Sequence, residues 1–587
     1  MKRIPRAVAF AVALLSTQIA CIRASDTAAP AAAVPASAVA ASAPAVAAAP
    51  APAPAVAASA SAATPARDAD YARITILSTT DLHGHVYPVD YYTGKPSQDG
   101  LAKIATLIRQ ARQDAPRALL LDIGDVIQGT PLTYYHNRIN NTPADPMMLC
   151  MNALGYDSMT PGNHEYNFGL DVLNKARGEA AFPWLSANTV RAGTDTPAYV
   201  PYFVKEVDGV RVGVIGITTP GIPGWEDKPN YAGLEFRDPV ETAAKYVELL
   251  RGKENADVVV IAMHMGLEID LRNGKGETSP QPRENTAIEI AENVPGVDLI
   301  FMGHTHRDIP ALVVGNALLA QANRWGTNLV RADLYLAKTD SRWRIVARSA
   351  RSIAVDDRVA ADPEILALAE PYHRETQTWL DKVIGKNARE LTAADSRMRD
   401  TAIIDLIQRV QLESSGAEVS FSASFNPSAR IRSGDVTVRD LYSLYTYENT
   451  LTVVALTGAQ IKAALEHSAR YYERDEKSGK IGESTDIPGY NCDMAEGVTY
   501  EVDPAREAGG RILNLRWQGK PIDPARTFRV AVNNYRLNGG GGYTMFKNAP
   551  VLWRSSTEIR DLLINWVETH GEIPAEPTNN WRIIGMD

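Results

Sequence analysis

Ile74-Thr-Ile-Leu77 is a short apolar run, and the polar motif Asp81-Leu-His83 follows it closely. A short apolar run that ends at polar residues is typical of a buried strand. Later apolar runs are followed in the same way by motifs of Gly, His and Asp. Because the exits of buried strands converge at one edge of an α/β sheet, we expect these motifs to meet there. In chain order, the later pairs are 118–121 with Gly124-Asp125, 258–262 with His264, and 297–302 with Gly303-His304-Thr-His306.

Helical patterns lie between these apolar runs. Residues 100–115 place apolar side chains at helical spacing, as in a helix that packs one face on a sheet. A further strand is predicted at 212–217, and the alternation continues to about Val346. This pattern predicts an α/β domain.

The pattern changes in the second half of the chain. Residues 362–386 predict a single polar helix, without strand signals nearby, that connects two domains. Beyond it, an amphipathic helix at 458–472 is flanked by β-rich segments at 451–456 and 528–532. The second half therefore predicts a separate α/β or α+β domain.

The N-terminus has the layout of a secretory signal, with basic residues, an apolar stretch and then small residues. We expect an exported protein, periplasmic or otherwise, without a membrane span because the apolar stretch is short. Cys21 leaves a lipid anchor open, although soluble export is favoured. Residues 27–66 hold no charged side chain and predict a disordered Ala/Pro-rich linker. The expected boundaries are 1–24 for the signal peptide, 25–68 for the linker, 69–350 for the first domain, 351–386 for the connecting helix and 387–587 for the second domain.

Length and charge restrict the class of protein. A chain of 587 residues is too long for one hydrophobic core, so two folded domains are expected. A net charge of -9 without a run of Lys or Arg argues against a nucleic-acid polymer or an anionic membrane as partner. Small anionic substrates remain compatible with local arginines. Cys150 and Cys492 are expected to be two separate buried thiols rather than a disulfide.

The strand-exit motifs carry the ligands of a two-metal site. A carboxylate is the natural bridge between two divalent ions, and Asp125 is the predicted bridge. Imidazole, carboxylate and amide oxygens suit Zn, Mn, Co or Fe. Asp81 and His83 should alternate along an extended exit. The predicted first ion is held by Asp81, His83 and His306, and the second by Asn163, His264 and His304. His85 and His136 have no assigned role and are expected in loops or at the surface.

These motifs, together with Gly162-Asn-His-Glu165, resemble those of the calcineurin-like metallophosphoesterases, specifically the exported nucleotidases. The resemblance runs from Ile74 to the C-terminus. It implies a four-layer α/β/β/α sandwich with a dimetal centre, joined by a helix to a C-terminal α+β nucleotide-binding domain. It also implies hydrolysis of a phosphate ester by metal-activated water, with His164 and Asn167 as catalytic residues.

The segment around Asn167 indicates a branch of this family. Many 5'-nucleotidases carry Asp at this position, whereas this chain has Asn. With Asp90-Tyr-Tyr92, Ile127-Gln-Gly129 and Asn579-Asn-Trp-Arg582, the segment is most similar to the periplasmic 2',3'-cyclic-nucleotide 2'-phosphodiesterase/3'-nucleotidases. That branch implies nucleotides as small-molecule substrates.

In either branch, the C-terminal domain stacks the base between two aromatic rings, which the resemblance assigns to Tyr447 and Tyr535. Stacking is worth about 1–3 kcal/mol per base and tolerates any base. Arg397 matches a phosphate-binding arginine of the 5'-nucleotidases, but the Gly-Gly-x-Arg motif expected near Ser428 is not present. Arg430 could substitute for it or could be a solvated surface charge.

Two alternatives stay open. One is a 5'-nucleotidase or UDP-sugar hydrolase with the same metal chemistry. The other is a non-catalytic, surface-displayed nucleotide-binding protein that keeps the fold.

Overall fold

Strand β1 (Tyr71–Thr79) is the central strand of a five-stranded sheet in the computed structural model, which describes residues 70–271, 274, 276, 281–475 and 477–586. It pairs with β4 in parallel and with β14 in antiparallel orientation. The predicted signal peptide and Ala/Pro-rich linker lie outside the described residues. The strands of this first sheet are, in spatial order, β15 (Arg342–Ala354), β14 (Asn328–Thr339), β1, β4 (Leu119–Asp122) and β5 (Ser158–Met159).

The second sheet has six strands, and its four inner strands run parallel to one another. The strands predicted at 212–217, 258–262 and 297–302 are all present in it. In spatial order, its strands are β12 (Asp308–Val314), β13 (Ala317–Ala322), β11 (Leu299–Met302), β10 (Val258–His264), β8 (Val210–Thr218) and β7 (Tyr202–Val207).

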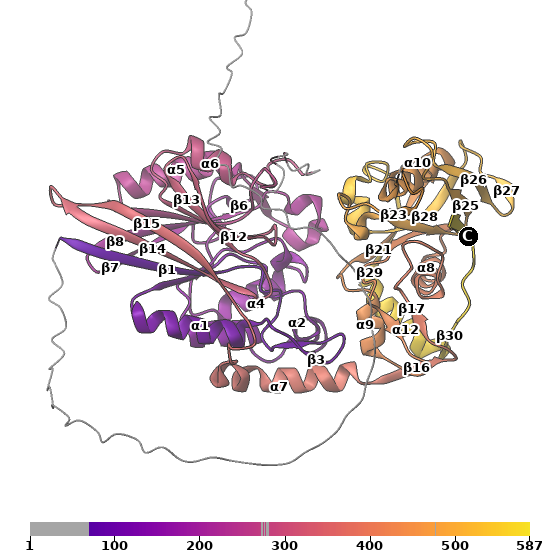
Figure 1. Cartoon of the computed structure of the whole chain (residues 1–587), viewed down its shortest axis with the longest axis horizontal. Helices are drawn as coiled ribbons and strands as arrows, with labels where there is room; N and C mark the ends of the chain where they lie inside the picture. Colours follow the sequence, from indigo (N-terminus) through magenta and orange to yellow (C-terminus); the bar gives the residue numbers. More distant parts are fainter. Residues whose placement is uncertain (1–69, 272–273, 275, 277–280, 476, 587) are drawn as a thin grey trace, which may run out of the picture. The chain divides into compact units, whose positions relative to one another are not determined.

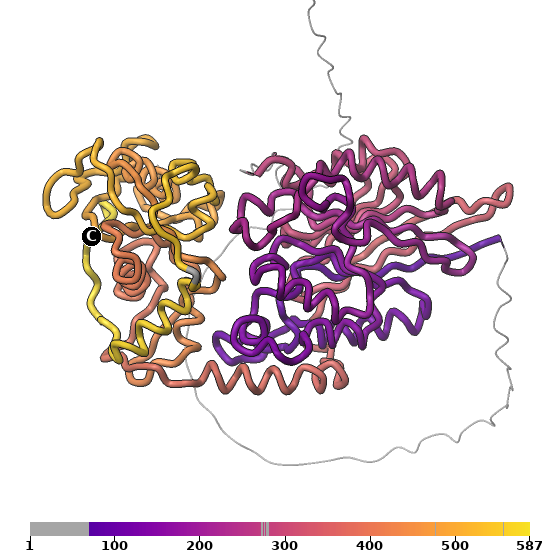
Figure 2. The backbone as a smooth tube through the Cα atoms, turned by 180° about the vertical axis from the view of Figure 1, so that it is seen from behind, coloured from indigo at the N-terminus to yellow at the C-terminus, as the bar shows by residue number. Residues whose placement is uncertain are grey.

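Side-chain alternation along the strands builds four layers. In β4, Leu119 and Leu121 pack between the two sheets, whereas Leu120 points to the helices on the outer face. In β10, Val260 packs between the sheets, and Val259 points to the helices over the second sheet. Figures 1 and 2 show these helices on the outer faces, so the predicted α/β/β/α sandwich is confirmed. The covering helices are α1 (Leu101–Asp114), α3 (Pro146–Leu154) and α4 (Leu170–Glu179) on one side, and α5 (Pro239–Gly252) and α6 (Ala287–Asn293) on the other.

A single helix, α7 (Pro363–Leu380), joins the sandwich to the C-terminal domain. Asp362 caps it by accepting hydrogen bonds from the backbone of Glu364 and Ile365, and Pro363 fits the first turn because no backbone donor is needed there. The helix is shorter than the predicted connector, because β15 continues to Ala354. The predicted helix extends too far at its other end, to Lys386, because β16 (Val383–Asn387) starts just after α7 ends.

The C-terminal domain has the predicted α+β character. The β-rich segments at 451–456 and 528–532 are adjacent strands of one sheet, and the amphipathic helix between them is α10 (Gly458–Ser468). In spatial order, the strands of this sheet are β24 (Asp493–Glu496), β18 (Val419–Ala423), β28 (Thr527–Asn533), β21 (Thr450–Thr457) and β29 (Val551–Glu558). The other main helices are α8 (Ala402–Ser415), α9 (Val438–Leu444) and α12 (Ile559–His570).

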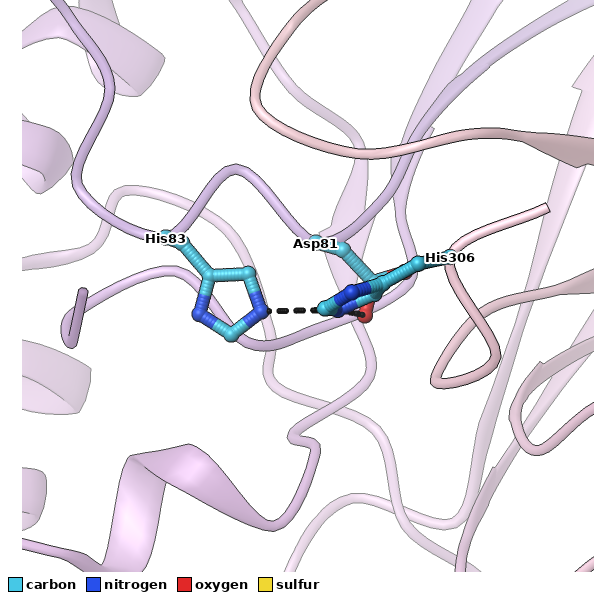
Figure 3. Close-up of side chains that lie close together, drawn as sticks. All are labelled: Asp81, His83 and His306. Atoms are coloured by element: carbon cyan, nitrogen blue, oxygen red, sulfur yellow. Dashed lines mark hydrogen bonds and ion pairs between the residues drawn. The ribbon is translucent and has the colours of Figure 1, made fainter. Parts of the chain in front are cut away.

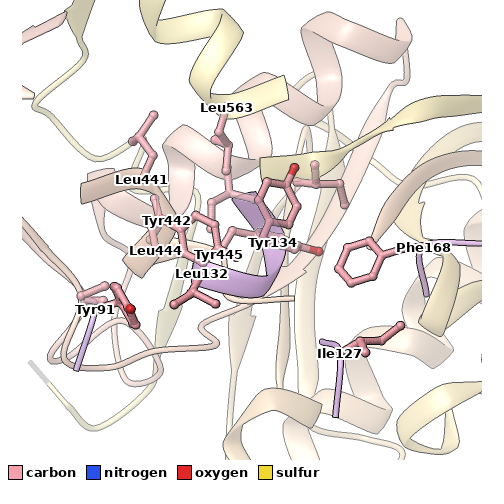
Figure 4. Packing of buried hydrophobic residues seen from close by; sticks show 14 of the residues in the cluster. Tyr91, Ile127, Leu132, Tyr134, Phe168, Leu441, Tyr442, Leu444, Tyr445 and Leu563 are labelled. Atoms are coloured by element: carbon pink, nitrogen blue, oxygen red, sulfur yellow. The ribbon is translucent and has the colours of Figure 1, made fainter. Parts of the chain in front are cut away.

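Aromatic side chains of the two domains pack together around a buried arginine. Tyr134, in the short helix α2 (Pro131–Tyr134), contacts Tyr442 of α9 with ring centroids 5.5 Å apart (Figure 4). The guanidinium of Arg560 lies 4.2 Å from the ring of Tyr134 and 3.8 Å from that of Tyr442. Its charge is paired with Glu448 at 3.0 Å. This buried cation therefore has both π and carboxylate partners where the side chains of the two domains meet.

Two predictions about single residues have opposite outcomes. Cys150 and Cys492 are free and buried, as predicted. The prediction that His136 lies in a loop or at the surface was wrong, because only 2% of it is exposed, within the π-helical turn Tyr135–Ile139. Within the described part of the chain, every helix is too short or too polar to cross a bilayer.

Candidate metal centre

The predicted ligands lie at strand exits where the backbone turns sharply. Asp81 and His83 follow β1, Asp125 follows β4, and His304 and His306 follow β11. All five have positive φ, between 46° and 70°, so the exit after β1 is not extended as predicted. Left-handed backbone is unfavourable for residues with a side chain and is often retained at functional sites. Here it accompanies the turn that brings Asp81 and His83 to one cluster, and His304 and His306 to different clusters.

The first cluster contains Asp81, His83 and His306 (Figure 3). The Nε2 atoms of the two histidines are 3.0 Å apart, and Nε2 of His306 is 3.3 Å from Oδ1 of Asp81. Asp81 is fully buried and also accepts a hydrogen bond from the hydroxyl of Thr80 at 2.6 Å. The sequence grouped these three side chains on one ion, and the structure brings them together.

The second cluster contains Asp125, His264 and His304. Oδ2 of Asp125 lies 3.0 Å from Nε2 of His264 and 3.8 Å from Nε2 of His83, so this carboxylate faces both clusters. Asn163 is nearly buried, and its Oδ1 has no hydrogen-bond partner among the described residues. A buried amide oxygen without a donor fits a cation ligand, because an unsatisfied buried acceptor is otherwise unfavourable.

Two of the histidines are held with one nitrogen facing the clusters. Nδ1 of His83 lies 3.1 Å from the carbonyl oxygen of Gln128, and Nδ1 of His264 contacts the carbonyl oxygen of Ile123 at 2.5 Å. Since a carbonyl only accepts, Nδ1 must carry the hydrogen in each ring. Nε2 is then the nitrogen available to a cation, which is the arrangement of histidine ligands in metal sites.

The electrostatics of the clusters favour a positive charge between them. Burial alone would lower the pKa of His264, but Asp125 raises it to about 10. Burial alone would raise the pKa of Asp125, but His264 and His164 hold it well below its usual range. Burial lowers the pKa of His83 to about 3. The Asp125 carboxylate thus draws positive charge onto the imidazole of His264, while His83 nearby stays neutral. A buried site that attracts positive charge and offers carboxylate and imidazole ligands fits a divalent ion.

Glu165 and Gly162 explain how the Gly162-Asn-His-Glu165 loop fits against Asp125. The Glu165 carboxylate accepts hydrogen bonds from the backbone of Asp125, Val126 and Gly162 at 2.6–2.9 Å, which ties the two loops together. A Cβ atom at Gly162 would lie 2.2 Å from Oδ1 of Asp125. Only glycine allows this close approach.

The predicted catalytic pair is joined by a short hydrogen bond. Nδ1 of His164 lies 2.6 Å from Oδ1 of Asn167, and the backbone nitrogen of His164 donates to Oδ1 of Asp125 at 2.8 Å. Burial alone would lower the pKa of His164, but Asp125 and Asn167 raise it. His164 is therefore fixed beside the candidate bridge, with its ring 5.1 Å from that of His83.

The two predicted base-stacking tyrosines lie near each other with a third tyrosine. Burial, together with the phenols of Tyr490 and Tyr535, raises the pKa of Tyr447 to about 12. Tyr447 is still 37% exposed, and its ring packs edge-on against Phe425. Tyr490 is also partly exposed and was missed in the sequence, because an isolated Tyr in Pro488-Gly-Tyr490 carries no signal of its own.

The two predicted arginines are engaged elsewhere. Nε and Nη2 of Arg397 donate to the carbonyl oxygen of Ser424 at 3.2 and 2.9 Å. Arg430 is exposed and pairs with Glu390 at 3.3 Å. Among the described residues, neither arginine has a recorded contact with the metal clusters.

A polar contact between the domains reaches the first cluster. The side-chain Nε2 of Gln128 donates to the carboxylate of Glu448. The backbone carbonyl oxygen of the same residue accepts from Nδ1 of His83. Glu448 directly follows Tyr447, so one segment of the C-terminal domain carries a predicted stacking ring and a support of a candidate ligand. The sequence did not reveal this link, because it depends on how the domains meet.

Comparison with known proteins identifies the family. Residues 74–308 match the family model of the calcineurin-like phosphoesterases, and residues 381–548 match that of the 5'-nucleotidase C-terminal domain. This chain belongs to the calcineurin-like phosphoesterases that carry a 5'-nucleotidase C-terminal domain. In a phosphoesterase of this kind, the two His/Asp clusters suggest a dinuclear metal site.

The names of several relatives of this phosphoesterase include nucleotides as substrates. It is 32% identical to the 2',3'-cyclic-nucleotide 2'-phosphodiesterase/3'-nucleotidase of Haemophilus influenzae, over 87% of this chain and 87% of the relative. It is 30% identical to a trifunctional nucleotide phosphoesterase of Bacillus subtilis over 88% of this chain, which spans 39% of that protein. A crystal structure of a candidate 5'-nucleotidase from Staphylococcus aureus superposes with a TM-score of 0.78 at 28% identity, over 87% of this chain and 100% of the other. The chain is a nucleotide phosphoesterase of the 5'-nucleotidase and cyclic phosphodiesterase family.

Proposed function

We propose that this protein is an exported 2',3'-cyclic-nucleotide 2'-phosphodiesterase and 3'-nucleotidase. The observation that carries the proposal is the two-cluster site of a phosphoesterase together with similarity to the Haemophilus influenzae enzyme along most of both chains. Asn167 and the engagement of Arg397 and Arg430 in other contacts support this choice over a 5'-nucleotidase. Without an arginine pair for a terminal 5'-phosphate, an internal or 3'-linked phosphate fits better.

Seven side chains would hold the two divalent ions. Asp81, His83 and His306 would bind the first ion, and Asn163, His264 and His304 the second, with Asp125 between them. When bound, ions of the Zn, Mn, Co or Fe class supply Lewis acidity and activate water for attack on phosphorus. Oδ2 of Asp125 supports this assignment, because it faces histidines of both clusters.

His164 would act on the phosphoryl group or the leaving oxygen. Its Nδ1 is engaged by Asn167, so Nε2 is the nitrogen that can donate a hydrogen bond to the substrate. A donor fixed in this way stabilises the charge that grows on the phosphoryl and leaving oxygens.

Replacing Tyr447 or Tyr535 by alanine should raise KM for 3'-AMP by about 10-fold or more, because one stacked ring is worth about 1–3 kcal/mol. Hydrolysis of p-nitrophenyl phosphate should change little, since this ester has no base to stack. The exposed Tyr335 on β14 gives a matched control, Tyr335→Ala. Equal losses on both esters would make the tyrosines structural.

Hydrolysis of 2',3'-cyclic AMP, 3'-AMP, 5'-AMP and UDP-glucose by metal-supplemented protein tests the substrate assignment. We expect kcat/KM for the cyclic and 3' esters to exceed that for 5'-AMP by about 10-fold or more, the ratio expected where about 1.4 kcal/mol of binding energy separates two substrates. Dominant 5'-AMP or UDP-glucose hydrolysis would instead favour a 5'-nucleotidase or UDP-sugar hydrolase. Binding of all four without turnover would support the non-catalytic nucleotide-binding protein.

Export is part of the proposal and rests on the N-terminal signal. Expression of the full chain in a Gram-negative host, followed by fractionation, should place the processed protein in the periplasm. Labelling with a palmitate analogue would distinguish a lipid anchor at Cys21 from soluble export.

A further inference from the structure

The hydrogen-bond chain that begins at His164 does not end at Asn167. Nδ2 of Asn167 donates to Oε1 of Glu226 at 2.5 Å, and Nδ2 of Asn230 donates to Oε2 of the same carboxylate at 2.8 Å. Glu226 is 7% exposed, and it lies in the loop that follows β8. A nearly buried carboxylate with an amide donor on each oxygen is a built feature rather than a surface charge.

Glu226 determines which groups donate and which accept along these hydrogen bonds. A carboxylate only accepts hydrogen bonds, so the side of the Asn167 amide that faces it must be the NH2 group. The amide oxygen must then face His164, and Nδ1 of His164 must carry the hydrogen. Without the carboxylate, the amide could turn over and accept a hydrogen from its other neighbour, and His164 could take the opposite tautomer.

Through consecutive residues, the same loop contacts the second cluster, the predicted catalytic pair and the C-terminal domain. The ring of Trp225 lies 5.3 Å from that of His304 in the second cluster. Asp227 pairs with Arg554 of the C-terminal domain at 2.7 Å. Between them, Glu226 reaches Asn167. The carboxylate is therefore anchored on both sides and keeps a fixed position relative to the catalytic pair.

We propose that Glu226 is a positioning residue that acts through Asn167 to hold His164 in the Nδ1-protonated tautomer, with Nε2 directed to the substrate. In this protein, the side chain hydrogen-bonded to His164 is the amide of Asn167 rather than a carboxylate. The carboxylate of Glu226 contacts that amide instead of the histidine. The inference rests on the proposed function insofar as His164 acts on a phosphate ester, but it does not depend on which nucleotide is the substrate.

An exchange of the two side chains tests this arrangement. In Glu226→Gln, the amide of Asn167 faces another amide, so either orientation of the Asn167 amide is allowed. We therefore expect kcat to fall by about 10- to 100-fold, as for other outer supports of an active centre. In Asn167→Asp alone, two carboxylates face each other. In the double variant Asn167→Asp/Glu226→Gln, the introduced carboxylate accepts from both His164 and the introduced amide. One direction is thereby restored, and kcat should return to within about threefold of the wild type.

The assay uses p-nitrophenyl phosphate with the metal-loaded full-length protein, and thermal unfolding is followed in parallel. KM and the unfolding temperature should stay near the wild-type values in both Glu226→Gln and the double variant. Glu235→Gln is the matched control, because Glu235 lies on strand β9 (Leu234–Phe236), pairs with Arg237 just after that strand, and has no recorded contact with Asn167. The 15N spectrum of labelled histidines, with His164→Ala for assignment, reports the tautomer directly.

Three results would overturn the proposal. They are a Glu226→Gln protein as active as Glu235→Gln, a loss that the double variant does not repair, and a His164 spectrum with Nε2 protonated in the wild type. If the wild type hydrolyses p-nitrophenyl phosphate but none of the nucleotides, the proposed function fails while this test remains valid.

Discussion

Removal of divalent ions by a chelator should abolish hydrolysis and lower the unfolding temperature of the protein by about 5–10 °C. In the proposed reaction, the ions would supply Lewis acidity and water activation. An ion at about 100 times its Kd stabilises the folded state by about 2.7 kcal/mol, and 1 kcal/mol corresponds to about 2–4 °C in a domain of this size class. Buried Asp81 and Asp125 have no lysine or arginine partner among the described residues, so a bound cation is what would balance their charge.

Addition of Mn2+, Zn2+ or Co2+ after removal of the chelator should restore both the hydrolytic activity and the unfolding temperature. Asp125→Asn is the control, because it weakens both candidate sites at once and should show little gain in unfolding temperature when the ions return. Full activity in the presence of excess chelator, with a metal content below one ion per chain, would contradict the two-metal assignment.

The positions of the candidate ligands could be predicted because their signal is local. A buried strand needs a continuous apolar run, and a polar His or Asp just after that run has few roles other than a site at the sheet edge. His264 shows the strength of this signal, since it ends an otherwise apolar strand and is fully buried. The left-handed backbone at Asp81 and His83 could not be predicted, because it results from loops packing on one another rather than from the residue types.

Glu226 shows which part of the site the sequence does not reveal. It stands in Trp225-Glu-Asp-Lys228, where neighbouring charges are typical of a solvated loop. Its burial depends on the path of the chain after β8 and on Asn167, which lies 59 residues earlier in the sequence, although Asn230 contacts it from the same loop. His136 was misjudged for the same reason, because neighbouring elements bury it while its local sequence is polar. Contacts made only by the tertiary fold leave no periodic pattern in the sequence.

Replacing His164 by alanine should lower kcat for 3'-AMP by about 10²–10⁴-fold, the usual contribution of a positioned proton donor or acceptor. KM and metal content should change little, because the proposed metal ligands are other side chains and the proposed base-stacking tyrosines lie in the C-terminal domain. His570→Ala is the matched control, since His570 is exposed on α12 and stacks only on Trp566. A loss of metal together with activity would make His164 a structural support of Asn163 instead. Unchanged turnover would show that His164 has no role in the reaction. The hydrogen bonds from His164 through Asn167 to Glu226 would then have no catalytic role either.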